Sequence, residues 1–257
     1  MGKLYIVEGL PCSGKSTAAK FIAEKVHGIC IDEGSGKHPA DYEFHAFIPK
    51  QAFNGFTEDE LLHISEHSEI RPDGYILPLS AVSGELFDKA LKYKIYDFLP
   101  WETEYPIMLE KWRSFAENAD SIYVLNCVLL QNPMCETMIR FNFDISVSAE
   151  YIAKICEVVK DMSPTVIYLR NNYIAESIRA ALPERGDDWL NSVIHYHCDG
   201  EYGKANSLSG FDGYISALCE RQRRELEILS SLPVRSTVIN DPQNDFTTAY
   251  SEIEKFL

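Results

Sequence analysis

The stretch YIVEGLPCSGKSTAAKFIAEKV, residues 5–26, contains the glycine-rich segment that decides the fold. Its centre, GLPCSGKS, fits the pattern G-x-x-x-x-G-K-[ST], with Gly9, Gly14, Lys15 and Ser16 at the fixed positions. The residues before the glycines are typical of a strand, and the apolar residues after them recur at helical spacing. A strand, a glycine-rich turn and a helix in this order predict a loop that binds phosphate.

The spacing of this loop has a physical reason. Glycines let successive backbone N–H groups turn inward around an anion, and the helix that follows adds its positive N-terminal end. Lys15 is expected to reach the outer phosphates, and Ser16 to hold Mg²⁺. The residues predicted to bind the nucleotide are Gly9, Cys12, Ser13, Gly14, Lys15, Ser16 and Thr17. The same helix N-terminus is expected to lower the pKa of the Cys12 thiol and so make nucleotide binding sensitive to thiol reagents.

Strand-like and helix-like runs alternate through much of the chain. Runs rich in β-branched and aromatic residues predict five strands, the second of them buried, at 3–8, 28–34, 121–130, 164–170 and 234–240. Helical patterns follow or precede the later strands at 176–186, 215–232 and 249–257. This alternation predicts an α/β fold, a parallel sheet covered by helices on both faces.

The interval 35–118 does not follow this rhythm. It contains scattered aromatic residues and prolines, with helix-like pieces at 57–67 and 84–96. Structureless loops of this length are uncommon in compact domains, so the interval is interpreted as a mostly helical, aromatic-rich cap that binds the acceptor. The core is then formed by residues 1–34 and 119–257.

Composition excludes several functional classes. The chain has 257 residues, 46% of them hydrophobic, and 24 Lys and Arg against 39 Asp and Glu, a formal charge of −15. A surface of this charge repels nucleic acid and anionic lipid. No leader-like segment or long apolar run is visible, and the seven cysteines form no C-x-x-C pair. We therefore expect a cytoplasmic protein with reduced thiols and neither nucleic-acid nor membrane partners.

An acidic partner for the phosphate-binding loop is expected at the carboxyl end of a strand. The strand at 121–130 offers Asn126 and Cys127 where many such proteins carry an aspartate. Asp32 and Glu33, which follow the second strand, are the nearest carboxylates. One of them is expected to orient or deprotonate an acceptor hydroxyl while the other faces Mg²⁺. The alternative is a solvated turn that only ends a strand.

The layout resembles the thymidylate kinase and deoxynucleoside kinase group of P-loop kinases. The resemblance rests on GLPCSGKS, on a strand that ends in carboxylates, on the aromatic-rich insertion, and on PTVIYLRNNYIAESIRAALPERGDDW at 164–189. It implies a three-layer P-loop NTPase fold with a five-stranded parallel sheet in the order 2-3-1-4-5. It also implies phosphoryl transfer from ATP with Mg²⁺ to a nucleoside, a nucleotide or another small acceptor, and dimers formed through helices are common in the group.

The resemblance also suggests residue roles. Arg179 and Arg185 correspond to the arginines of the LID, which neutralise charge on the transferred group; the alternative is that they are ordinary surface cations. Thymidylate kinases carry an Asp-Arg pair after the third strand, but this chain has NCVLLQNPMCETMIRF at 126–141. That segment makes thymidylate a doubtful substrate. It offers Gln131, Asn132 and Arg140 as acceptor-binding residues, with the two amides reading a polar acceptor.

Other residues carry weaker signals. Trp101 and Tyr105 could stack on a base, although packing inside the cap explains them equally well. The histidine pairs at 63 and 67 and at 195 and 197 lack the further ligands of a zinc site. The run RQRRELE at 221–227 is interpreted as a solvated helix face, because each arginine has acidic neighbours at helical distance.

The leading hypothesis is a Mg–ATP-dependent kinase whose acceptor is a nucleoside or a nucleotide. Two alternatives stay open: a phosphotransferase that modifies antibiotics or sugars, and an ATP-binding switch module without catalysis. A GTPase is disfavoured because no N-K-x-D segment follows the fourth strand and no D-x-x-G follows the third. ABC-type and helicase-type motors are disfavoured by the missing acid after the third strand and by the acidic surface.

Overall fold

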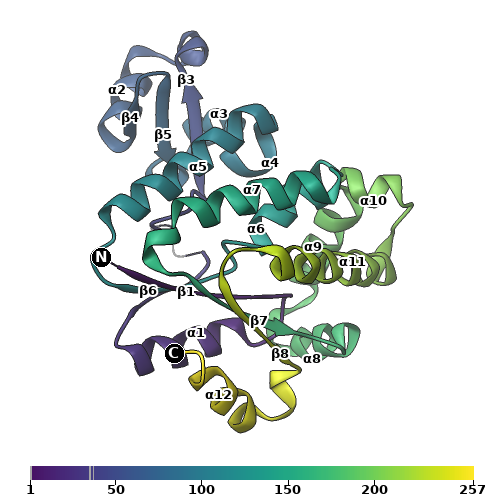
Figure 1. Ribbon diagram of the computed structural model, residues 1–257. Helices are drawn as coiled ribbons and strands as arrows, with labels where there is room; N and C mark the ends of the chain where they lie inside the picture. The colour runs from purple at the N-terminus through teal and green to yellow at the C-terminus, as the bar shows by residue number, and fades with distance from the viewer. Residues whose placement is uncertain (1, 35, 37) are drawn as a thin grey trace. The chain divides into compact units, whose positions relative to one another are not determined.

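The computed structural model describes residues 2–34, 36 and 38–257 (Figure 1). The chain divides into two compact units, Met1–Glu33 with Phe115–Leu257, and Gly34–Ser114. The first unit contains a parallel sheet with strands β1 (Lys3–Gly9), β2 (Ile29–Ile31), β6 (Ile122–Asn126), β7 (Thr165–Arg170) and β8 (Arg235–Asn240). The strands lie in the order β2-β6-β1-β7-β8. When the five strands of this sheet are numbered 1 to 5 in chain order, their order is 2-3-1-4-5, as predicted.

The central strand β1 explains why the sheet is buried at its middle. It pairs in parallel with β6 on one side and β7 on the other, and every residue from Leu4 to Gly9 is buried. A strand covered on both faces reads as a continuous apolar run, which is the pattern of LYIV. At the edge, β2 pairs only with β6, and Ile29 is 44% exposed. The prediction of a buried second strand is therefore wrong, because an edge strand has a neighbour on one side only.

Helices cover both faces of this sheet, as predicted. One face packs on α1 (Lys15–Val26) and α12 (Phe246–Glu254), whose Ile22 and Ile253 join Val7 and Ile167 of the sheet in one apolar cluster. In Figure 1, α7 (Ile145–Val158) and α11 (Gly210–Ser231) lie on the opposite side from α1 and α12. The remaining helices of the unit are α6 (Gln131–Met134), a π-helical turn Cys135–Arg140, α8 (Ile174–Arg185), α9 (Asp187–Asp199) and α10 (Glu201–Ala205).

The second unit combines helices with a small sheet. Its helices are α2 (Glu58–His67), α3 (Gly84–Leu91), α4 (Ile95–Phe98) and the first part of α5 (Trp101–Asn118). Two of them, α2 and α3, correspond to the predicted helical pieces. The antiparallel sheet β3-β5-β4, formed by His45–Pro49, Gly74–Pro78 and Glu69–Arg71, was not predicted. Its strands have five residues or fewer and two of them end in proline, so their alternation is too short to stand out from loop sequence.

A capping box fixes the beginning of α2. The Thr57 hydroxyl accepts a hydrogen bond from Glu60 N at 3.2 Å, and the Glu60 carboxylate accepts one from Thr57 N at 2.8 Å. Each bond satisfies a backbone donor that a helix N-terminus leaves without a partner. Behind the helix, Ile64 packs with Ile48 and Leu77 in the core of this unit.

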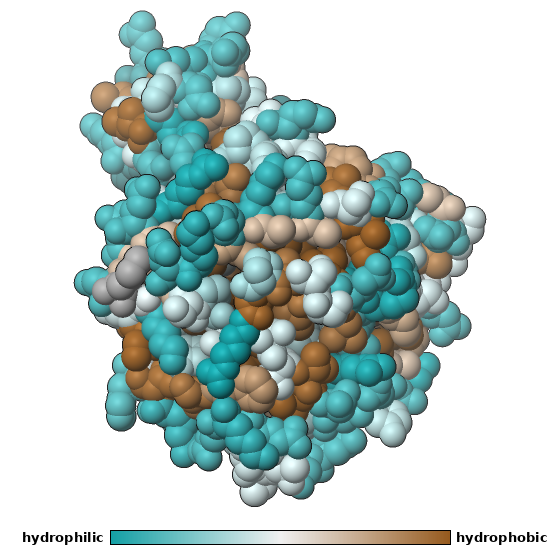
Figure 2. Space-filling model, viewed as in Figure 1, coloured by the Kyte–Doolittle hydropathy of each residue, from teal (hydrophilic) through white to brown (hydrophobic). Residues whose placement is uncertain are grey.

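Hydrophilic side chains cover much of the face drawn in Figure 2, with apolar residues between them. Within the described ranges, no helix has both the length and the apolar character needed to cross a bilayer.

Candidate functional site

The glycine-rich loop lies between β1 and α1 in the geometry that an anion nest requires. Cys12 and Gly14 adopt left-handed backbone conformations with φ of 61° and 91°, so that backbone N–H groups of the turn face inward. Gly9 also has a positive φ, and a Cβ at this position would lie 2.5 Å from the carbonyl oxygen of Leu169. Only glycine fits there, since a side chain would collide with β7.

Two polar side chains are buried within this loop. Lys15 is 8% exposed, and its Nζ donates a hydrogen bond to the Leu10 carbonyl oxygen at 2.7 Å. Ser13 Oγ is buried without a hydrogen-bond partner in the described part of the chain. Ser16 and Thr17 are exposed at the first turn of α1. A buried hydroxyl without a partner is costly, and a phosphate oxygen would satisfy it, so the loop fits a phosphate ligand.

At Cys12, burial has a larger effect on the pKa of the thiol than the helix N-terminus has. Desolvation raises the pKa of its thiol above the ordinary value, and the positive charges of Arg185 and Lys15 only partly oppose that rise. The expected low pKa at Cys12 is therefore wrong, because the thiolate would lose more hydration than the loop returns.

The two carboxylates after β2 have different surroundings. Asn126, at the end of β6, accepts a hydrogen bond from Glu33 N at 2.9 Å and donates one to Asp32 Oδ1 at 3.1 Å. The Asp32 carboxylate then faces α1, where its Oδ2 lies 3.6 Å from Lys20 Nζ. The Glu33 carboxylate accepts a hydrogen bond from Gln131 Nε2 at 2.9 Å.

Electrostatics at Cys127 show which carboxylate lies near the loop. Burial raises the pKa of this thiol well above its ordinary value, Lys15 opposes the rise, and Glu33 adds to it. Both Lys15 and Glu33 therefore lie close to Cys127. Glu33 therefore lies beside the same thiol as Lys15 of the glycine-rich loop, whereas Asp32 pairs with Lys20 of α1.

Glu8 is a buried carboxylate that the sequence reasoning did not identify. It is fully buried and accepts three backbone hydrogen bonds, from Leu129 N at 2.7 Å, Leu130 N at 2.9 Å and Gln131 N at 3.1 Å. These bonds fix the segment between β6 and α6, and with it Gln131, the partner of Glu33. Its signal in the sequence is a charge in an otherwise apolar strand, since charged residues are rarely buried without a partner.

The ionisation of Glu8 is coupled to stability. Burial raises its pKa to about 7, and Glu225 adds to the rise, although the three backbone donors oppose it. Because the folded pKa exceeds the unfolded value of 4.5, wild type should lose stability as the pH rises from about 5 through 7. A shift of this size corresponds to about 3 kcal/mol.

We expect the variant Glu8→Gln to lack this pH dependence. The free energy of unfolding is measured by urea denaturation for both proteins. Relative to that of Glu8→Gln, the value for wild type should be lower at pH 8 than at pH 5. Taking the difference cancels the contributions of groups that both proteins share, such as His197. A difference that is the same at both pH values would show that Glu8 does not titrate in this range.

A buried ionic group lies beside Glu8 under α11. Tyr168 stands opposite Glu8 in the β1–β7 register, and its hydroxyl donates to Glu225 Oε2 at 2.5 Å. Arg221 Nε lies 3.1 Å from Glu225 Oε1, and its Nη1 donates to Cys135 Sγ at 3.2 Å. Arg221 and Glu225 are both buried, so the prediction of a solvated face is wrong for them. It holds for Arg223, which pairs with acidic neighbours on the exposed side.

The two predicted LID arginines stack on aromatic rings. The Arg179 guanidinium lies 4.6 Å from the ring centre of Phe211, and that of Arg185 lies 5.2 Å from that of Trp189. Both arginines are on α8 and exposed. Only Arg185 acts on the Cys12 thiol, so its charge lies close to the phosphate-binding loop.

The predicted acceptor residues fall into both units. In the first unit, Gln131 is buried, and its Oε1 lacks a partner among the residues described. Asn132 follows it, half-buried, in the same short helix α6. Arg140 donates to Glu136 Oε2 at 2.6 Å. Trp101 is in the second unit, where its ring centre lies 5.4 Å from that of Tyr105.

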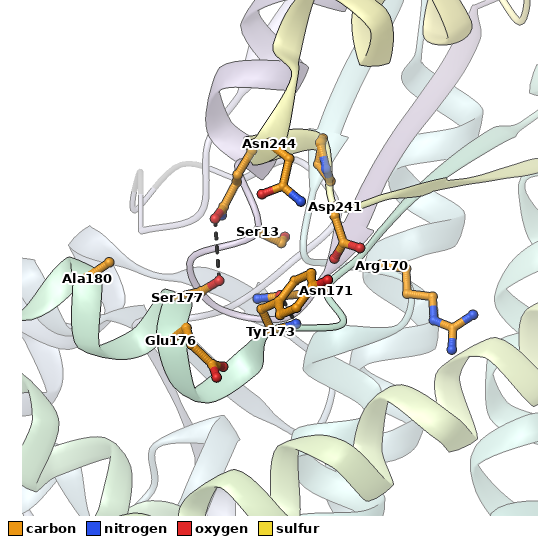
Figure 3. A pocket seen from close by; sticks show the side chains of 11 residues that line it. Ser13, Arg170, Asn171, Tyr173, Glu176, Ser177, Ala180, Asp241 and Asn244 are labelled. Atoms are coloured by element: carbon orange, nitrogen blue, oxygen red, sulfur yellow. Dashed lines mark hydrogen bonds between the residues drawn. The ribbon is translucent and has the colours of Figure 1, made fainter.

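A cavity of about 330 Å³ adjoins the phosphate-binding loop and was not predicted (Figure 3). Its lining comes from three places: Ser13 of the loop, the end of β7 with the start of α8, and residues 241–244 after β8. Asn171 is 5% exposed and its Nδ2 has no partner in the described ranges, whereas the Tyr173 ring is 55% exposed. An aromatic ring beside a free amide donor suits a flat polar ligand.

The strand order and the glycine-rich loop together decide the architecture. The chain has a P-loop α/β fold. In its first unit the glycine-rich loop follows the central strand of a parallel sheet, and Lys15, Glu33 and Gln131 come after the carboxyl ends of β1, β2 and β6.

Comparisons with known proteins give structural likeness only. No protein-family model matches the sequence, and no curated protein matches it. Among solved structures, deoxyadenosine kinase from M. mycoides with bound dATP is 16% identical, with a TM-score of 0.46, over 98% of each chain. The same kinase with bound dCTP is 14% identical, with a TM-score of 0.44, over 99% of this chain and 98% of that one. The YorR protein from Bacillus subtilis, in complex with phosphorylated GDP, is 14% identical, with a TM-score of 0.44, over 99% of this chain and 95% of that one.

Proposed function

We propose that the chain transfers a phosphoryl group from Mg–ATP to a hydroxyl or phosphate of a small acceptor, a nucleoside or a nucleotide. The observation that carries the proposal is that Lys15, directly after the glycine-rich loop, and Glu33, after β2, both lie beside the Cys127 thiol. A phosphate cradle and a carboxylate base are the two parts that phosphoryl transfer to a hydroxyl requires.

Two groups of residues would bind the donor nucleotide, one its phosphates and the other its base. The backbone donors of the loop, Lys15 and Ser13 Oγ would hold the outer phosphates, and Ser16 would hold Mg²⁺. When bound, the metal neutralises phosphate charge and raises the reactivity of the γ-phosphoryl group. The cavity beside Ser13 is of a size and chemistry that suit the base, with Tyr173 as stacking surface and Asn171 Nδ2 as donor.

In the proposed transfer to a hydroxyl, each bond and the proton can be accounted for with the residues present. The acceptor oxygen forms the new P–O bond, the bond between the γ-phosphorus and its bridging oxygen breaks, and the bridging oxygen leaves on ADP. Glu33 takes the hydroxyl proton. Arg185, whose charge already reaches Cys12 of the loop, would stabilise negative charge on the group in flight.

The side-chain amides of Gln131 and Asn132 favour an acceptor that carries polar groups. Gln131 uses Nε2 to hold Glu33 and keeps Oε1 available, so a donor group of an acceptor base could bind there. Asn132, Arg140 and Trp101 remain proposed contacts to the acceptor. We propose that the second unit, with Trp101, acts as the cap over it.

The test is ADP release by the purified protein with Mg–ATP, in the presence of nucleosides, nucleoside monophosphates, sugars or hydroxylated antibiotics. We expect release to depend on a nucleoside or a nucleotide. Release only with sugars or antibiotics would replace the proposed acceptor while keeping the reaction. ATP binding without release in the presence of any acceptor would overturn the proposal in favour of a binding module.

A further inference from the structure

A second cavity, of about 410 Å³, lies within the second unit. Its lining includes three histidines, His38, His45 and His67, together with Lys111 of α5. No part of the proposed phosphoryl transfer uses these residues. Two features of the lining point to a ligand, a buried donor and an unpaired cation.

The donor is His38. Its side chain is 5% exposed, and its Nδ1 accepts a hydrogen bond from Ala40 N at 3.2 Å. Burial and the charge of Lys111 lower its pKa to about 4, so the ring is neutral at pH 7 and carries its proton on Nε2. That Nε2 is buried with no partner in the described part of the chain, as is Nδ1 of His45. A buried donor without an acceptor is costly unless a ligand satisfies it.

The cation is Lys111. Its Nζ lies 4.3 Å from the ring centre of Tyr42, and it belongs to none of the ion pairs formed among the described residues. The charges of Glu69 and Asp41 act on it from a longer distance, and each of these carboxylates accepts a hydrogen bond from a tyrosine hydroxyl, Glu69 from Tyr42 at 2.7 Å and Asp41 from Tyr96 at 2.7 Å. The ammonium group of Lys111 can therefore donate hydrogen bonds to a ligand. Its charge also lowers the pKa of both His38 and His45.

We infer that this cavity binds a small anionic molecule through its phosphate or carboxylate oxygens, with His38 Nε2–H and Lys111 as the donors. Both groups donate, and anionic oxygens are the acceptors that bind such donors most strongly. The cavity is larger than one oxyanion and lies in the range of small-molecule sites, so the anionic group belongs to a larger ligand. Among the described residues, no three His, Cys, Asp or Glu side chains are placed to hold a metal ion together.

The test uses nuclear magnetic resonance of the histidine rings in the full chain, titrated with inorganic phosphate and, separately, with acetate. The chain has seven histidines, and two of those outside the second unit, His27 and His195, report on folding. We expect saturable shifts at His38 and His45. A response to phosphate alone assigns the site to phosphate esters, and a response to both anions assigns it to carboxylates as well.

Variants distinguish binding in this cavity from nonspecific attraction of the anion to surface lysines. Lys111→Met keeps an apolar stem against Tyr42 and should weaken binding at least about tenfold, because hydrogen bonds to charged groups exceed neutral ones. Lys92→Met, at an exposed position after α3, should bind as wild type does. No shift at His38 with either anion, or equal affinity in Lys111→Met, would overturn the inference. Neither result bears on ATP turnover, since no nucleotide is present.

Discussion

The variant Lys15→Ala should lose at least about 10³-fold in ATP-dependent turnover while it keeps the fold. A fixed positive charge at a transferring phosphoryl group is worth about 10³-fold or more in rate, because it acts in a site prepared before the reaction. The stability cost should be small, about 1 kcal/mol, since the substitution removes the hydrogen bond that Lys15 donates to Leu10. Coupled ADP release measures turnover, direct titration measures ATP affinity, and urea denaturation measures the stability cost.

A lysine of the same helix provides the control. Lys25 lies in the last turn of α1, where its Nζ pairs with Glu254 at 2.6 Å, and Lys25→Ala should leave turnover unchanged. Circular dichroism and a melting curve establish that each variant is folded. If folded Lys15→Ala binds and turns over ATP as wild type does, the loop is not a phosphate cradle.

Local patterns were sufficient to predict the main sheet. Each of its strands contains a short run of β-branched or aromatic residues. The glycine-rich loop is continuous in sequence, so residues 5–26 contain everything needed to recognise it. The strand order came from the resemblance to P-loop kinases rather than from the strands themselves. The antiparallel sheet of the second unit was missed, because its strands are short and lie among prolines and aromatic residues.

Residues whose roles depend on distant partners could not be predicted. Glu8 binds backbone groups 121 to 123 positions away, and Arg221 reaches Cys135 across 86 positions. Helical spacing indicated that Arg221 and Glu225 could pair, but it could not indicate that the pair is buried. Asn171 is a similar case, since its buried and unpartnered amide becomes evident only where α8, β8 and the loop meet.

The error at Cys12 has a general physical reason. A helix N-terminus favours a thiolate, but the sequence does not report how much hydration the thiol loses on folding. In this loop the loss is the largest influence on the thiol, so its pKa rises despite two nearby cations. Rules based on local structure give the direction of a pKa shift only when burial is small.

Adjacent carboxylates allow the base to be identified by substitution. Glu33→Gln should lower kcat by about 10² to 10⁴-fold, the usual range for loss of a general base, with ATP affinity close to that of wild type. The substitution retains the side-chain oxygen that accepts from Gln131, so the geometry should persist. Asp32→Asn should lower kcat by less than about tenfold, because Asp32 faces Lys20 at the surface of α1 rather than the loop.

Comparing the two variants tests the assignment directly, because they lie in one turn and share Asn126 as a partner. A general disturbance of the turn would lower kcat to the same extent in both, and ATP affinity would fall with it. A specific loss in Glu33→Gln separates kcat from ATP affinity and makes Glu33 the base. If Asp32→Asn is instead the inactive variant, Asp32 is the base and the role proposed for Glu33 is wrong.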